Sequence, residues 1–387
     1  MESLIIVLYQ SWPRFRKIYP NMRSKRPAIG PEVPVDLPVL SVFAGAGGLD
    51  LGFQSAGFRS AIAIDIDPAA IATYKRNHPS TKAVQLDLAS TDPTDIVNLW
   101  EKHTGRIKPV GIIGGPPCQG FSSSNLHQRQ NDPRHRLLDS YANIVEKFAV
   151  YLGLDFFVLE NVPGLVSRRH QRLFHQFKDT CEAAGFKVIQ KILDAGRFGI
   201  PQHRKRLVVV GINRRHYPAI DFQLPEGDQQ TLPIKAVLSD LPEPVFCTRG
   251  LSSSDIPFHP NHVTMVPRSP KFTNGSLKPG YTKGLSFKVL TWDSPSYTVA
   301  YGHNEVHVHP GCHRRLSVYE AMLLQGFPSW YQLEGTFSQQ VQLVSDAVPP
   351  PLGEGIAHAI ARLLAKNEGE SLHHLPNEKQ DLRGCHS

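Results

Sequence analysis

The chain has 387 residues, of which 41% are hydrophobic and 20% are charged, and its formal net charge is +8. This composition excludes a disordered chain and indicates a globular protein with one large hydrophobic core and a smaller second domain. The positive charge favours a polyanionic partner such as a nucleic acid, but charge alone identifies none.

The cysteines and the N-terminal segment limit the class of protein further. Five cysteines are widely spread without a C-x-x-C pair, which argues against a disulfide framework and a structural zinc site and favours a reducing, cytoplasmic location. The first apolar run, residues 4–9, is too short for a membrane span and has no basic segment before it, unlike a signal peptide. Residues 1–36 are predicted to form a leader, whose basic side chains either contact phosphates or form a solvated tail.

Between residues 37 and 215, short apolar runs alternate with helix-length segments. Helices are expected after a glycine-rich turn near residue 45 and from Pro68 to about residue 78, where proline suits the first turn. The alternation predicts an α/β fold, a doubly wound, mostly parallel sheet. The predicted strands are residues 39–43, 61–64, 84–86, 110–113, 156–159, 187–193 and 207–210.

The composition changes after Arg215. Residues 216–313 are rich in Pro, Ser, Thr, Gly and His and have few periodic apolar runs, which predicts a separate, loop-rich module. Helical character returns at residues 317–325 and 352–365. Residues 367–387 are expected to be a tail.

Glycines and acids follow the first three predicted strands. A glycine-rich turn follows the first strand, Asp65 ends the second, and Asp87 ends the third. Such a turn permits close approach of a ligand, and an acid at a strand end accepts hydrogen bonds from ribose hydroxyls. We expect an adenosine ligand here, although Asp65 and Asp67 can also be explained as caps of the helix at Pro68.

Three further positions carry candidate catalytic side chains. Cys118 lies in a rigid Gly-Gly-Pro-Pro-Cys-Gln-Gly run after the fourth strand, and Glu160 follows the fifth. Arg204 and Arg206 alternate onto one face before the last strand. Each has a structural alternative: a buried thiol, a capping glutamate and a solvated basic edge.

Six motifs in register resemble those of the cytosine-5 DNA methyltransferases. The resemblance covers residues 38–215 and 314–362. The motifs are Phe43–Leu49, Pro116–Ser122, Glu160–Val162, Gln202–Arg206, Arg315–Pro328 and Ala347–Pro350.

The resemblance implies the S-adenosylmethionine-dependent methyltransferase fold and that cofactor. It places the methionine end at the glycine-rich turn, the ribose at Asp65 and the adenine at Asp87, with Ile66 where the family often has an aromatic residue. The implied cofactor residues are Phe43, Ala44, Gly45, Gly47, Gly48, Leu49, Asp65, Ile66, Asp87, Leu88, Pro117, Asp346 and Ala347. Asp346 departs from the family, which commonly has Gly-Asn where this chain has Ser345-Asp346.

The resemblance also implies a catalytic role for each candidate. The Cys118 thiolate adds to C6 of cytosine and makes C5 nucleophilic, while Glu160 protonates N3. Arg206 holds the cytosine O2, and Arg204 steadies the nucleophile loop. Because a base in a duplex is out of reach, the nucleotide must flip out, and residues 121–136 are expected to close over it.

Residues 216–313 occupy the place of the family's target recognition domain, between residues 37–215 and 314–366 of the catalytic domain. We expect DNA contacts from basic side chains interleaved with aromatic ones. These are Arg249, Arg268, Lys271, Lys278, Lys283 and Lys288 with Tyr281, Phe287 and Trp292. The histidines at 303, 307, 309 and 313 have no cysteine pair beside them, and no metal site is expected.

The resulting hypothesis is a monomeric DNA cytosine-5 methyltransferase that protects double-stranded DNA from a cognate restriction endonuclease. Two alternatives stay open: a methyltransferase acting on transfer RNA, and a catalytically weak DNA-binding regulator. The target sequence is not identified by these motifs.

Overall fold

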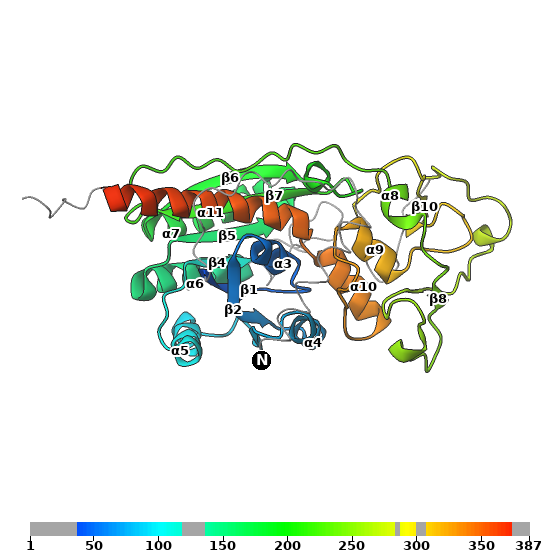
Figure 1. The fold of residues 1–387 in the computed structure, drawn as a ribbon, viewed down its shortest axis with the longest axis horizontal. Helices are drawn as coiled ribbons and strands as arrows, with labels where there is room; N and C mark the ends of the chain where they lie inside the picture. The colour runs from blue at the N-terminus through cyan, green and yellow to red at the C-terminus, as the bar shows by residue number, and fades with distance from the viewer. Residues whose placement is uncertain (1–36, 118–135, 283–286, 299–306, 374–387) are drawn as a thin grey trace, which may run out of the picture.

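A seven-stranded sheet forms the centre of the protein in the computed structural model, which describes residues 37–117, 136–282, 287–298 and 307–373 (Figure 1). The nucleophile candidate Cys118 lies outside these described residues, as do the loop to residue 135, the leader and Lys283. The sheet's strands are β1 (Leu37–Val42), β2 (Phe58–Asp65), β3 (Lys82–Gln85), β4 (Gly111–Gly114), β5 (Phe156–Asn161), β6 (Phe186–Asp194) and β7 (Lys205–Asn213).

The strand order is β3-β2-β1-β4-β5-β7-β6. Strands β1 to β5 pair in parallel, whereas β7 runs antiparallel to both of its neighbours, β5 and β6. All seven predicted strands are present, so the prediction of a doubly wound, mostly parallel sheet is confirmed. The order reverses between β1 and β4, which is the place where open α/β sheets bind ligands.

The four helices predicted by position are present and differ from the prediction in their ends, whereas α8 and α10 were not predicted. The helix that Asp67 caps begins at Pro68 and ends at Asn77, and the last predicted helix begins at Pro350 and extends to His373, beyond the predicted residue 365. The helices are α3 (Gly48–Ser55), α4 (Pro68–Asn77), α5 (Pro93–Thr104), α6 (Arg136–Leu152), α7 (Gln171–Ala183), α8 (Lys235–Leu238), α9 (Val318–Leu324), α10 (Phe337–Asp346) and α11 (Pro350–His373).

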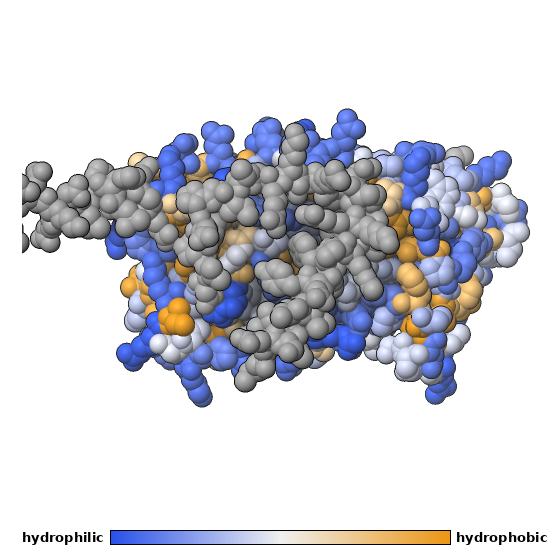
Figure 2. Space-filling model, in the orientation of Figure 1, coloured by the Kyte–Doolittle hydropathy of each residue, from blue (hydrophilic) through white to orange (hydrophobic). Residues whose placement is uncertain are grey.

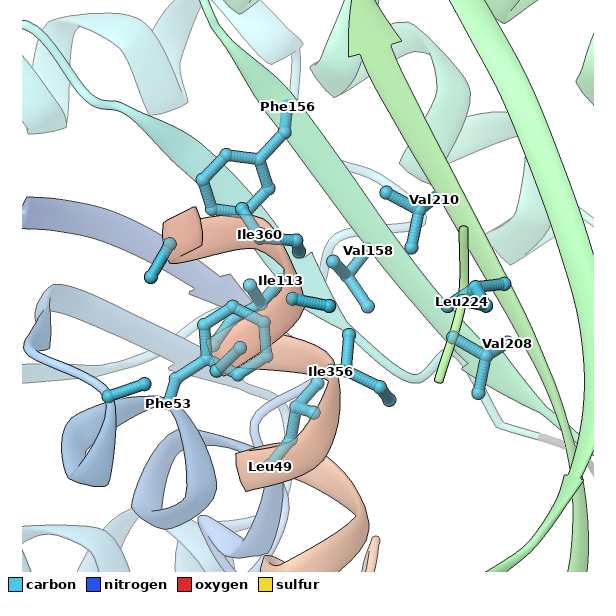
Figure 3. Packing of buried hydrophobic residues seen from close by; sticks show 14 of the residues in the cluster. Leu49, Phe53, Ile113, Phe156, Val158, Val208, Val210, Leu224, Ile356 and Ile360 are labelled. Atoms are coloured by element: carbon cyan, nitrogen blue, oxygen red, sulfur yellow. The ribbon is translucent and has the colours of Figure 1, made fainter. Parts of the chain in front are cut away.

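Helices cover both faces of the sheet with separate hydrophobic clusters. On one face, α3 and α11 pack together, and Figure 3 shows Leu49 and Phe53 near Ile356 and Ile360. On the other face, α5, α6 and α7 bury a second cluster that includes Trp100. Because β5 and β7 are apolar on both faces, the middle of the sheet is fixed between these two layers.

The described part of residues 216–313 is loop-rich and contains α8 with two small two-stranded sheets. Their strands are β8 (Val245–Phe246), β9 (Val263–Thr264), β10 (Lys288–Val289) and β11 (His307–Val308). One hydrophobic cluster joins Ile234, Val263 and Leu290 of this region to Met322 of α9 and Val344 of α10. The region therefore packs against the C-terminal helices rather than around a core entirely its own.

Figure 2 shows that hydrophilic side chains predominate along the margins of the face in view, with smaller hydrophobic areas between them, where grey atoms do not cover it. None of the helices in the described residues is long and apolar enough to cross a membrane.

Candidate active site

The sheet brings the candidate residues to one edge. The carboxyl ends of the parallel strands β1, β2, β4 and β5 meet there and lead into the glycine-rich turn, Asp65, the Pro116-Pro117 segment and Glu160. Because β7 is antiparallel to β5, its beginning lies at the same edge and carries Arg204 and Arg206 to it. One antiparallel strand thus adds two cations to a site otherwise built from parallel strand ends.

The turn after β1 has an unusual backbone. Phe43, Gly45 and Gly47 have φ angles of 53°, 54° and 75°, in the left-handed region that glycine tolerates best. A Cβ added at Gly45 meets no atom within 4 Å, so the turn is open on that side. Phe43 and Ala44 are half-buried beside it, so this turn leaves room for a ligand against its backbone.

Asp65 ties the ends of β1 and β2 together. Its carboxylate accepts hydrogen bonds from the backbone N–H groups of Gly45, at 2.8 Å, and Asp67, at 2.9 Å. Burial raises the pKa of Asp65, and these N–H donors oppose that rise. Asp67, not Asp65, caps α4, by accepting from Ala69 N–H at 2.8 Å. Capping therefore accounts for Asp67 only, and a carboxylate has further lone pairs with which Asp65 can bind a ligand.

Exposed apolar side chains follow the ends of two strands. Ile66 is 60% exposed directly after Asp65, and Pro117 is exposed after β4. Asp87 is half-buried and accepts from Ala89 N–H and the Ser90 hydroxyl, with Leu88 buried beside it. Exposed apolar side chains and acids at neighbouring strand ends are the residue types that an adenosine requires.

Three of the predicted cofactor residues face the interior. Gly48 lies so close to the Val348 carbonyl oxygen that an added Cβ would be 2.2 Å from it. The side chain of Leu49 packs into the core under α11, and Ala347 is buried at the end of α10. In this structure these three residues support the turn from behind.

Glu160 and Arg206 form a buried ion pair. Arg206 Nε lies 2.9 Å from Glu160 Oε1, and the two side chains are 10% and 8% exposed. Burial raises the pKa of the Glu160 carboxyl, Arg206 and Arg204 oppose that rise, and Asp346 adds to it. A carboxyl with these neighbours retains a proton to higher pH than an exposed glutamate and is suited to proton donation.

The segment that leads to Cys118 passes directly beside Glu160. A Cβ built on Gly115 would lie 3.2 Å from Glu160 Oε2, so glycine allows this close approach. Asn161 Nδ2 donates to the Pro116 carbonyl oxygen at 3.0 Å. The structure therefore fixes residues 115–117 against the end of β5, although Cys118 itself is outside the described residues.

Arg204 connects this edge to the C-terminal segment. It is fully buried, and its Nη2 donates to the carbonyl oxygens of Ser345, at 2.7 Å, and Ala347, at 3.0 Å. Asp346 lies between these two residues, has an exposed surface and accepts from Gln342 Nε2. Surrounding protein atoms raise the pKa of Asp346, and Gln342, Arg204 and Arg206 oppose that rise.

The predicted DNA-contacting residues take different positions. Arg249, Arg268 and Lys278 are exposed. Lys271 lies over the ring of Phe287, with Nζ 4.8 Å from its centroid, and Tyr281 and Trp292 are half-buried. Within the described residues, no group of three or more His, Cys, Asp or Glu side chains is arranged to hold a metal ion.

Sequence reasoning missed two features of the site. Asn161 belongs to the Glu160–Val162 motif, but its bond to Pro116 depends on how β4 and β5 pair. Tyr331 belongs to none of the six motifs, yet its hydroxyl donates to the Ala46 carbonyl oxygen in the glycine-rich turn. No local signal marks Tyr331, because the contact joins distant parts of the chain.

Comparison with known proteins shows the family to which the chain belongs. A sequence model of the family "C-5 cytosine-specific DNA methylase" matches residues 37–362. The chain is 30% identical to Type II methyltransferase M.MthTI of Methanothermobacter thermautotrophicus, over 85% of this chain and 98% of that protein. It is 31% identical to Type II methyltransferase M1.HphI of Haemophilus parahaemolyticus, over 85% and 88% of the two chains.

Solved structures share the fold. A putative DNA modification methyltransferase of Escherichia coli is 23% identical with a TM-score of 0.70, over 85% of this chain and 99% of that one. The DNMT2 protein of Spodoptera frugiperda is 16% identical with a TM-score of 0.56, over 85% and 99%.

Proposed function

The chain belongs to the family of C-5 cytosine-specific DNA methylases, and on this premise we propose how its site performs the reaction. It is a DNA cytosine-5 methyltransferase of the restriction–modification type. We infer that its nucleophile is Cys118, its proton donor Glu160 and its cofactor S-adenosylmethionine. The substrate is double-stranded DNA with one specific target sequence.

The residues at the switch point fit S-adenosylmethionine, which supplies an electrophilic methyl group when bound. The open turn at Phe43–Gly45 would hold the amino-acid end, and Asp65 would accept hydrogen bonds from the ribose. Exposed Ile66 and Pro117 would cover the adenine, with Asp87 and Leu88 at its edge. These groups bind and orient the cofactor and exclude water from one of its faces.

The protein's chemical task is to make cytosine C5 nucleophilic. The Cys118 thiolate forms a bond to C6, and Glu160 delivers its proton to N3, so negative charge does not build up on the ring. Arg206 would hold the cytosine O2 and steady Glu160 through their ion pair. Once C5 carries the methyl group, the C5 proton would leave to a base, the N3 proton would return to Glu160, and the Cys118 thiolate would depart from C6, which restores the aromatic base.

The buried Glu160–Arg206 pair beside Gly115 is the observation that carries this proposal. A buried acid is costly unless it is paired or used, and this one lies next to the segment that leads into Cys118. Burial raises its pKa, as a proton donor at neutral pH requires. Glycine at position 115 lets the segment that leads into Cys118 lie directly against this carboxyl.

The substrate must reach this edge as a flipped-out nucleotide, because the reacting atoms of a paired base are enclosed in the duplex. We assign residues 216–313 as the target recognition domain, with Arg249, Arg268 and Lys278 as exposed phosphate or base contacts. The enzyme acts as a monomer and protects its target from a cognate restriction endonuclease.

Bisulfite sequencing of plasmid DNA tests the proposal. Cells expressing the full chain should contain cytosines protected in one short repeated context, and cells expressing Cys118→Ala should contain none. The variant should still bind S-adenosylmethionine in calorimetry, because it keeps the cofactor residues. Protected cytosines in cells expressing Cys118→Ala would refute the assignment of Cys118 as the nucleophile. Methylation of transfer RNA without protection of DNA would refute DNA as the substrate.

A further inference from the structure

A chain of buried polar side chains lies behind the glycine-rich turn. It runs from Asp50 in α3 through Tyr74 and His78 to Tyr331, and all four residues are less than 10% exposed. Polar groups this deep are costly unless they are hydrogen-bonded. The reaction proposed above uses none of them, so their presence requires another explanation.

Tyr331 makes the direct contact with the turn. Its hydroxyl donates to the carbonyl oxygen of Ala46, between the left-handed residues Gly45 and Gly47. A Cβ at Gly47 would lie 2.7 Å from Tyr331 Oη and 2.8 Å from His78 Nε2, so the turn rests directly on these two side chains. The Tyr331 hydroxyl therefore fixes the orientation of the Ala46 carbonyl.

The Tyr331–Ala46 bond determines the role of His78, because a carbonyl oxygen can only accept. His78 Nε2 lies 3.1 Å from Tyr331 Oη. Because the Tyr331 proton is donated to Ala46, His78 must donate Nε2–H and accept nothing at this atom. Burial lowers the pKa of His78, although Asp50 opposes this effect, so the neutral imidazole that donates from Nε2 is favoured.

Asp50 anchors the other end of the chain. Its Oδ1 accepts from the Ser60 hydroxyl at 2.6 Å and from the Tyr74 hydroxyl at 2.9 Å. The Tyr74 ring stacks on His78, with their centroids 4.4 Å apart. Asp50 also lies in the first turn of α3, where the helix dipole favours a negative charge. The imidazole is thus held in place from α3, α4 and the turn together.

The segment that carries Tyr331 is fixed on two sides. Asn77 Nδ2, at the end of α4, donates to the Gln332 carbonyl oxygen at 2.7 Å, and Gln332 N–H returns a bond to Asn77 Oδ1. Asn261, in the recognition region, donates from Nδ2 to the Leu333 carbonyl oxygen at 2.8 Å and accepts at Oδ1 from Leu333 N–H at 2.9 Å. Tyr331 consequently has little freedom to follow a turn that moves.

We propose that Tyr331, with His78 as its hydrogen-bond donor, is a positioning residue that holds the Ala46–Gly47 turn in its cofactor-binding shape. This inference rests on the proposed cofactor. Without the hydroxyl, the left-handed turn loses its fixed carbonyl and must be ordered again each time the cofactor binds, which weakens binding. Tyr331 acts from behind the turn and touches no reacting atom.

Calorimetry with S-adenosylmethionine and the full chain measures the effect. Tyr331→Phe removes the hydrogen bond to the Ala46 carbonyl and the bond that the hydroxyl accepts from His78, and it should weaken cofactor binding about 5- to 10-fold. Tyr141→Phe is the matched control, because Tyr141 is also fully buried and donates to a backbone carbonyl, that of Val158, at 2.7 Å. The control should lose comparable thermal stability and keep the wild-type dissociation constant within about twofold.

Substitutions at His78 test the donor itself. His78→Gln keeps an N–H donor and should preserve cofactor binding. His78→Leu has no donor and should weaken cofactor binding as Tyr331→Phe does. Amide hydrogen exchange of residues 44–48, without cofactor, should be faster in Tyr331→Phe and His78→Leu than in wild type or Tyr141→Phe.

Each outcome decides the inference. Unchanged binding by Tyr331→Phe, or an equal loss in Tyr141→Phe, would overturn it, since the first shows no role and the second only general destabilisation. If the wild-type chain binds no S-adenosylmethionine, the proposed cofactor fails, and the exchange rates of residues 44–48 still decide whether Tyr331 orders the turn.

Discussion

Glu160 and Arg206 lie on the same face of the sheet because β5 and β7 are antiparallel and Glu160 pairs with Val208. Residues two apart on β7 share a face, so Arg206 is the diagonal neighbour of Glu160. The ion pair therefore depends on strand register. A shift of β7 by one residue would turn Arg206 to the opposite face.

Arg206→Gln should slow methyl transfer about 100-fold and shift its pH dependence. Glu160 donates a proton only while it is protonated, so activity falls as the pH rises through its pKa. Arg206 favours the ionised form, and its removal raises the Glu160 pKa further. The falling limb of the kcat–pH profile should thus move to higher pH; a shift to lower pH, or none, would contradict Glu160 as the acid.

Asp346→Asn should shift the falling limb of the kcat–pH profile in the opposite direction, to lower pH. Asp346 adds to the rise in the Glu160 pKa, so a neutral side chain at this position lowers that pKa and moves the limb to lower pH. Saturating single-turnover rates across pH would measure the shift. Glu354→Gln, which neutralises an exposed carboxylate on α11, should leave the limb in place.

Arg204→Met should destabilise the fold by about 2 to 4 kcal/mol, because it leaves the buried carbonyls of Ser345 and Ala347 without this donor. Urea unfolding measures the change. Arg197→Met is the matched control, since Arg197 also donates to a carbonyl, that of Gly227, but is exposed. It should cost no more than about 0.5 kcal/mol. Equal losses would indicate that the two carbonyls of the C-terminal segment are not held by Arg204.

Asn161→Ala should reduce kcat about tenfold while leaving cofactor affinity unchanged, because it releases residues 115–117 from the end of β5. Asn213→Ala removes an equivalent buried bond, from Asn213 Nδ2 to the Leu154 carbonyl at 2.7 Å, at the opposite edge of the sheet. The two variants should lose similar stability. If both lose the same activity, the bond to Pro116 has no specific role in catalysis.

The sequence by itself determined the seven strands, four of the helices and the family. Short apolar runs bounded by turn residues predict strands whatever their place in the sheet. Six motifs in the family's order indicate one family and its reaction. The sequence also placed Asp65 and Glu160 at strand ends, because each follows directly after a run of apolar residues. These features depend only on residues that are close together in the sequence.

The tertiary structure decided how distant segments meet. The antiparallel direction of β7 brings Arg206 to Glu160, and the fold brings Arg204 to Ser345 and Ala347 and Tyr331 to Ala46. No periodicity encodes these contacts, because each joins segments far apart in the chain through strand order and packing. Leu49 and Gly48 also show what the fold adds: a motif names both as cofactor residues, and only the structure shows that the Leu49 side chain packs into the core and that Gly48 lies against the Val348 carbonyl.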